Sequence, residues 1–70
     1  MNATAEGELV LAPRDYGKIG ALHCGVTREG FVTVGGDVAA IGEGESVRFE
    51  RHRVTVRRDG EDYRFVRDPA

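Results

Sequence analysis

Residues 45–66 alternate between apolar and polar side chains, and this alternation constrains the fold more than any other feature of the chain. The apolar residues recur at a spacing of two, in the pairs Val47 and Phe49, Val54 and Val56, and Tyr63 and Phe65. A period of two places successive side chains on opposite faces of a strand. The segment therefore predicts a three-stranded antiparallel meander with one apolar face.

Two turns would join these strands and set their register. If Arg51-His52 and Asp59-Gly60 each form a two-residue turn, Val47 lies opposite Val56, and Val56 lies opposite Tyr63. Asp-Gly is the stronger turn signal, because it supplies the positive φ angles of a type I′ turn. A longer loop at Arg51-His52 would slip the register by one residue and expose the apolar face.

The rest of the chain consists of short apolar segments separated by breaks that contain glycine. Strands are expected over residues 8–12, 19–26 and 31–34, with a hairpin loop over 27–30, and residues 38–41 read as a strand or a single helical turn. Leu22, Cys24 and Val26 should share one face of the second strand. Residues 1–6 lack a buried pattern and predict a disordered tail, and residues 7–67 predict one domain.

Five to six short antiparallel strands in one open sheet would leave an apolar face bare. Closure into a small barrel or a tight two-sheet sandwich hides that face and reduces the number of open edges. We therefore expect an all-β domain, and specifically a small SH3-like or OB-like antiparallel barrel.

The length and charge of the chain restrict its function. A domain of 70 residues builds a thin core and has little room for an enclosed active site. The net charge of −2 gives the chain as a whole no electrostatic attraction to phosphate backbones or anionic membranes. These properties favour a non-enzymatic domain.

Residue usage also indicates a cellular setting. Cys24 is the only cysteine, which excludes an intramolecular disulfide and favours a reducing compartment. The N-terminal residues do not resemble a signal peptide, and no apolar segment approaches the roughly 20 residues that a membrane span needs. We expect a soluble cytoplasmic protein, and a virion component is an open alternative.

Candidate catalytic and ligand-binding groups are few. His23 and Cys24, with His52, could form a thiol–imidazole pair, but the alternation places Cys24 on an apolar face where a buried, unreactive thiol is expected. One cysteine and two separated histidines cannot supply a structural zinc site. The glycines of residues 42–44 lie beside Glu43 and Glu45, which would repel phosphate. The sequence predicts no catalytic residue, no metal and no cofactor.

The polar side of the meander is the one candidate binding surface, which we call the arginine face. Its residues are Arg48, Arg53, Thr55, Arg57 and Arg64. OB-like barrels bind single strands on such a sheet face. The expected neighbours Glu50 and Asp62, opposite Arg53 and Arg57, would instead make ordinary cross-strand ion pairs.

Residues 36–50 resemble the second half of a cold-shock domain. The resemblance covers about a fifth of the chain and implies an OB-like fold that binds single-stranded nucleic acid. The chain departs from the family at Ala39 and Ala40, where stacking aromatic residues are expected. That departure puts base stacking in doubt.

Two functions follow from these observations. Binding to another protein or self-association, as an adaptor, a regulator or a structural subunit, is the first hypothesis, since a small β-domain gains buried surface by association. The alternative is binding of single-stranded nucleic acid through the arginine face.

Overall fold

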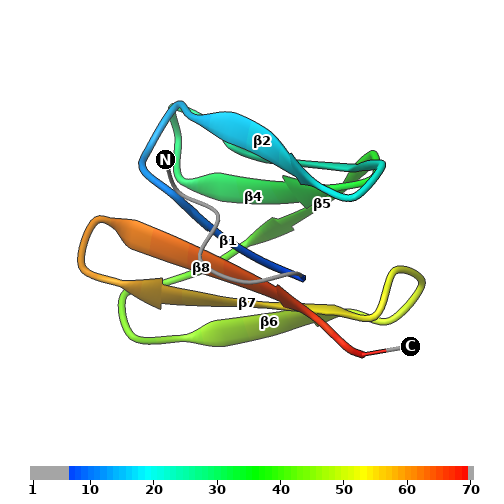
Figure 1. Ribbon diagram of the computed structural model, residues 1–70. Helices are drawn as coiled ribbons and strands as arrows, with labels where there is room; N and C mark the ends of the chain where they lie inside the picture. The colour runs from blue at the N-terminus through cyan, green and yellow to red at the C-terminus, as the bar shows by residue number, and fades with distance from the viewer. Residues whose placement is uncertain (1–6, 70) are drawn as a thin grey trace.

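The computed structural model describes residues 7–69, which form two four-stranded antiparallel sheets and no helix. Figure 1 shows the sheets as two layers. The strands are β1 (Glu8–Leu11), β2 (Tyr16–Ile19), β3 (Leu22–Val26), β4 (Phe31–Val34), β5 (Asp37–Ala40), β6 (Ser46–Phe49), β7 (Val54–Asp59) and β8 (Asp62–Arg67). One sheet has the order β1-β8-β7-β6 and the other the order β2-β3-β4-β5. The all-β prediction is confirmed.

The core lies between the two sheets and receives alternate side chains from both. Val54, Val56 and Phe65 come from one sheet, and Val32 and Val34 from the other, and all five are fully buried. Among the described residues no polar or charged residue is buried. The core therefore forms because every second side chain of each strand points into the space between the sheets.

The predicted register between β6 and β7 is confirmed. Val47 lies opposite Val56, and the ladder ends at the pair Phe49 and Val54. Residues 50–53 form the loop, in which Arg53 adopts a left-handed conformation with φ of 59°. The loop has four residues instead of the expected two. Because it is longer by one residue on each side, the pairing of Val47 with Val56 is unchanged.

The predicted register between β7 and β8 is wrong. Val56 lies opposite Phe65 rather than Tyr63, and the last pair is Asp59 with Asp62. The turn is therefore Gly60-Glu61, with a positive φ of 66° at its first central residue, which is the pattern of a type II′ turn. Because the turn centre moves by one residue, each residue of β7 pairs with a residue two positions further along β8. A shift of two leaves the apolar residues on the core face.

The predicted single strand over residues 19–26 is also wrong. Gly20, with φ of 62°, begins a turn after which Leu22 pairs back with Ile19, so the segment belongs to a hairpin of β2 and β3. Residues 7–69 consequently form eight strands rather than the expected five to six. The predicted shared face of β3 is confirmed, since Cys24 and Val26 are buried. The open alternative for residues 38–41 resolves as strand β5.

Side chains connect the two sheets at one end. His52 Nε2, in the β6–β7 loop, lies 3.1 Å from Asp37 Oδ2 at the start of β5. A Cβ atom on Gly35 would lie 2.6 Å from His52 Cε1, so the glycine permits this contact. No backbone ladder joins the sheets in the described part of the chain, so a closed barrel stays a prediction. The predicted tail, residues 1–6, lies outside the described residues.

Candidate binding faces

The structure gathers most of the arginine face on the outer side of the sheet β1-β8-β7-β6. Arg48 lies opposite Thr55, and Arg57 lies opposite Arg64. Arg53 is instead part of the β6–β7 loop and does not join the ladder. The surface therefore brings together four of the five predicted residues.

Ion pairs occupy two of these arginines. Arg48 donates two hydrogen bonds to Asp68, at 2.7 and 3.1 Å, and a third to Thr55 Oγ1 at 2.9 Å. Its Nε also lies 3.3 Å from a carboxylate oxygen of Glu50. The hydrogen bonds from Arg48 lower the pKa of Asp68 below its usual value. Arg64 pairs with Glu8 at 2.6 Å.

The predicted pairs of Glu50 with Arg53 and of Asp62 with Arg57 do not form. Glu50 contacts Arg48 instead, and the altered β7–β8 register places Arg64 opposite Arg57. Within residues 7–69, Arg53 and Arg57 make no ion pair. Two of the four arginines of the arginine face are thus compensated, through different carboxylates from those expected.

A second surface lies on the outer side of the sheet β2-β3-β4-β5, and we call it the hollow face. One row of paired residues crosses all four strands, in the order Tyr16, Gly25, Thr33 and Val38. Tyr16 is 84% exposed, Val38 is 57% exposed, and Phe31 in the neighbouring row is 44% exposed. These are large apolar side chains that nothing in the described chain covers.

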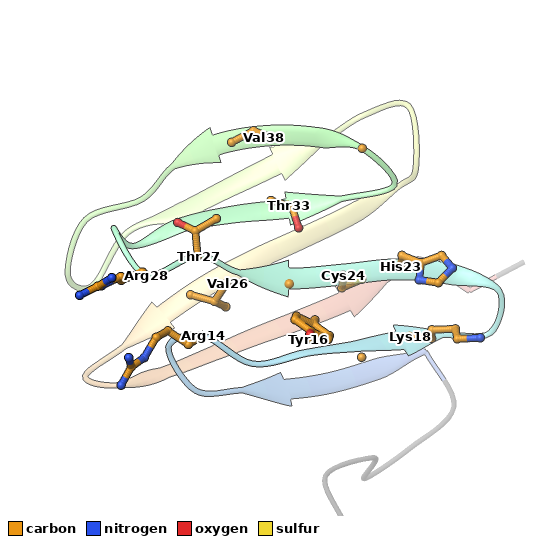
Figure 2. Close-up of a pocket in the computed structure, with 13 residues that line it drawn as sticks. Arg14, Tyr16, Lys18, His23, Cys24, Val26, Thr27, Arg28, Thr33 and Val38 are labelled. Atoms are coloured by element: carbon orange, nitrogen blue, oxygen red, sulfur yellow. The ribbon is translucent and has the colours of Figure 1, made fainter.

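Gly25 forms the floor of a hollow in this face. A Cβ atom at this position would lie 3.1 Å from Thr33 Oγ1 and 3.2 Å from Tyr16 Cβ, so any side chain here would crowd both neighbours. Tyr16 and Val38 stand on either side of the floor. Figure 2 shows the hollow with the side chains around it.

Basic side chains lie at both ends of the hollow. Arg14 and Arg28 lie at one end, and Lys18 and His23 lie at the other (Figure 2). No aspartate or glutamate is among the residues that line the hollow. The nearby Asp37 contacts His52 and Arg51 instead. The hollow face therefore combines apolar side chains with the cations Arg14, Lys18 and Arg28, which make no ion pair within residues 7–69.

Sequence reasoning missed the hollow face because Tyr16 falls between the expected strands, residues 8–12 and 19–26, where a turn is expected. Pro13 and Gly17 flank the segment and favoured an irregular connection, whereas the chain forms strand β2 from Tyr16. The available signal was the alternation of exposed Tyr16 and Lys18 with Gly17 and Ile19, which face the core.

The Cys24 thiol lies in the core. The side chain is only 2% exposed, and burial raises its pKa to about 11. His23 is exposed on the opposite side of the strand, and His52 contacts Asp37. The described residues contain no group of three His, Cys, Asp or Glu side chains placed to hold a metal ion.

Comparison with known proteins gives no relative for this chain: no family model, curated protein or solved structure matches it. Across residues 7–69 there is no helix with the length and apolar character needed to cross a membrane.

Proposed function

We propose that this domain is a non-enzymatic protein-binding module and that the hollow face is its docking surface. The observation that supports the proposal is the gathering of exposed Tyr16, Phe31 and Val38 on one side of one sheet. Contiguous exposed apolar side chains with a polar rim are typical of protein interaction sites. Tyrosine and phenylalanine are also enriched at such interfaces.

Other features support binding rather than catalysis. The only thiol is buried, with a raised pKa, and so is protonated at neutral pH. A free cysteine in the core also supports a reducing, cytoplasmic setting for the protein. The domain would act as an adaptor, a regulator or a subunit of a larger assembly.

Binding of single-stranded nucleic acid is the second candidate, and one observation favours it. The hollow face carries exposed Tyr16 and Phe31 together with Arg14, Lys18 and Arg28, which are the side chains that stack on bases and contact phosphates. An OB-like arrangement of the strands would use an open sheet face in the same way. The net charge of −2 opposes it, because a long polyanion is repelled by the chain as a whole.

Site-specific photo-crosslinking tests the proposal. A photoreactive amino acid replaces Val38 on the hollow face, and in a matched protein it replaces Arg57 on the arginine face. We expect position 38 to capture a protein in the producing cells and position 57 to capture none. The additional change Tyr16→Ala should abolish the capture at position 38, and nuclease treatment should leave it unchanged.

Two results would count against protein docking through the hollow face. Equal capture at positions 38 and 57 would show that the faces do not differ. Capture at position 38 that nuclease treatment removes would favour the second candidate instead.

A further inference from the structure

We infer that the hollow face binds an extended acidic segment of another protein, in which two carboxylates flank one apolar side chain. The inference rests on the proposed function and specifies the chemistry of the partner. It is drawn from the cations at the ends of the hollow and the shape of its floor.

The length of chain between the cations at the two ends limits their spacing. The backbone of Arg14 is bonded to Val26, because its N–H donates to the Val26 carbonyl at 3.0 Å, and Lys18 lies opposite His23 at the far end of β2. Lys18 follows Arg14 by four residues, and Arg14 lies in a turn with a left-handed φ of 70°, so the backbones of the two residues are at most about 13 Å apart. Figure 2 shows the two ends of the hollow with the apolar side chains between them.

A partner segment can match this spacing if it lies along the strands. In an extended segment residues i, i+2 and i+4 point to the same side, and i and i+4 are about 13 Å apart. Carboxylates at i and i+4 then reach the two cationic ends, while an apolar side chain at i+2 lies over Gly25. The required pattern is therefore acidic, any residue, apolar, any residue, acidic.

The width of the hollow favours an extended segment over a helix. Tyr16 on β2 and Val38 on β5 are three strand spacings apart, or about 14 Å between backbones, and both side chains project from the sheet and narrow the gap. A helix with its side chains is about 10–12 Å across and would rest on these walls. A single side chain of an extended segment fits between these walls, above the buried Gly25.

The cations also disfavour a second copy of this chain on the same surface. A two-fold symmetric contact places one patch against its own copy. Arg14, Lys18 and Arg28 would then face the same cations, without a carboxylate from the lining of the hollow to compensate them. A different partner, one that carries carboxylates, compensates these cations.

Selection from a random dodecapeptide library tests the inference. The wild-type protein serves as bait, and a Lys18→Glu/Arg28→Glu variant removes peptides that do not depend on the cations. We expect the recovered peptides to be enriched in Asp or Glu at i and i+4 around an aromatic or aliphatic residue at i+2. Recovery of no peptide, or of neutral or basic peptides, would overturn the inference.

The best recovered peptide is then measured by fluorescence anisotropy against matched variants. Replacing its two acids by amides should weaken binding at least tenfold, and moving one acid from i+4 to i+3 should weaken it similarly. The change Arg57→Glu in the protein, on the other face, should alter the affinity less than twofold. An unchanged affinity after either peptide change would contradict the proposed pattern.

Further measurements separate failure of the inference from failure of the proposed function. If binding requires Tyr16 and is abolished by Val38→Arg but not by loss of the acids, protein docking stands and the acidic pattern is wrong. If Tyr16→Ala and Val38→Arg leave the affinity unchanged, the hollow face is not the docking surface. Micromolar binding of a labelled 20-residue oligothymidylate, in competition with the peptide, would contradict both protein docking and the acidic pattern and would favour nucleic-acid binding.

Discussion

The two sheets contribute their inner faces to one core, but their outer faces differ in how their charges are compensated. On the arginine face, Arg48 and Arg64 are held by Asp68 and Glu8. On the hollow face, no aspartate or glutamate lines the hollow, Arg14 and Lys18 make no ion pair within residues 7–69, and Tyr16 is the most exposed large apolar residue in the described chain. The number of cations in a segment is thus a poor guide to a binding surface, because the nearby carboxylates decide which cations are available.

The largest expected effect on stability comes from comparing a residue of the shared core with a residue of the exposed apolar surface. Phe65 is fully buried and Phe31 is half exposed, although both lie in strands of alternating pattern. We expect Phe65→Ala to lower the free energy of unfolding by about 3–5 kcal/mol. Phe31→Ala should lower it by less than about 1 kcal/mol and affect partner binding instead. Urea denaturation followed by circular dichroism measures both, and equal losses would show that Phe31 belongs to the core.

A smaller effect is expected for the buried thiol on the inner side of β3. Cys24→Ala removes one buried heavy atom and should cost about 0.5–1.5 kcal/mol, while partner binding through the hollow face is retained. Because the pKa of the thiol is raised to about 11, iodoacetamide at pH 8 should modify the native protein only on the timescale of unfolding. Rapid modification of the folded protein, or loss of binding in a folded Cys24→Ala variant, would contradict the role of Cys24 as a buried, unreactive core residue.

The arginine face itself should bind nucleic acid weakly. We expect no affinity tighter than about 100 μM for mixed-sequence single-stranded DNA or RNA at physiological salt. Arg48 lies 3.3 Å from Glu50 and 2.7 Å from Asp68, and Arg64 lies 2.6 Å from Glu8. These distances are well below the screening length of about 8 Å at physiological salt, so salt screens the opposing charges little. Anisotropy titration tests this, and micromolar binding that disappears in an Arg48→Glu/Arg64→Glu variant would restore the arginine face as a site.

The smallest expected effect concerns the ion pair that compensates Arg48. The pKa of Asp68 is lower in the folded chain than in the unfolded one, so the pair stabilises the fold above the unfolded pKa, and this contribution is lost as the pH falls through the folded pKa. Carbon-13 NMR should show Asp68 titrating below the ordinary aspartate pKa of 3.8. In Arg48→Gln the midpoint should rise, and an unchanged midpoint would remove Arg48 as the cause.

Local patterns in the sequence predicted part of this fold. The alternation at Val47, Phe49, Val54 and Val56 fixes the β6–β7 pairing, because only one parity of register keeps these residues together on the core side. The type of a two-residue turn is less clear from sequence, since Gly60 can occupy either central position. For the same reason the turn at Gly20, and with it the hairpin of β2 and β3, was not predicted.

The candidate site was not predictable in the same way. The hollow depends on Tyr16, Gly25, Thr33 and Val38 coming from four strands in one row, and that row exists only once the hairpin at Gly20 has been placed. The compensation of the arginine face likewise depends on Asp68 and Glu8, which lie 20 and 56 residues from their partners. Pairings between residues so distant in sequence follow from strand topology, which alternation alone does not determine.

The central claim is that the hollow face binds the partner and the arginine face does not, and a chemical-shift titration tests it most directly. The partner protein recovered by crosslinking is added to the nitrogen-15-labelled domain, and amide shifts are followed in two-dimensional spectra. The account predicts the largest changes at Tyr16, Gly25, Thr33 and Val38, with small changes at Thr55 and Arg57. The largest changes on β6, β7 and β8 would contradict it.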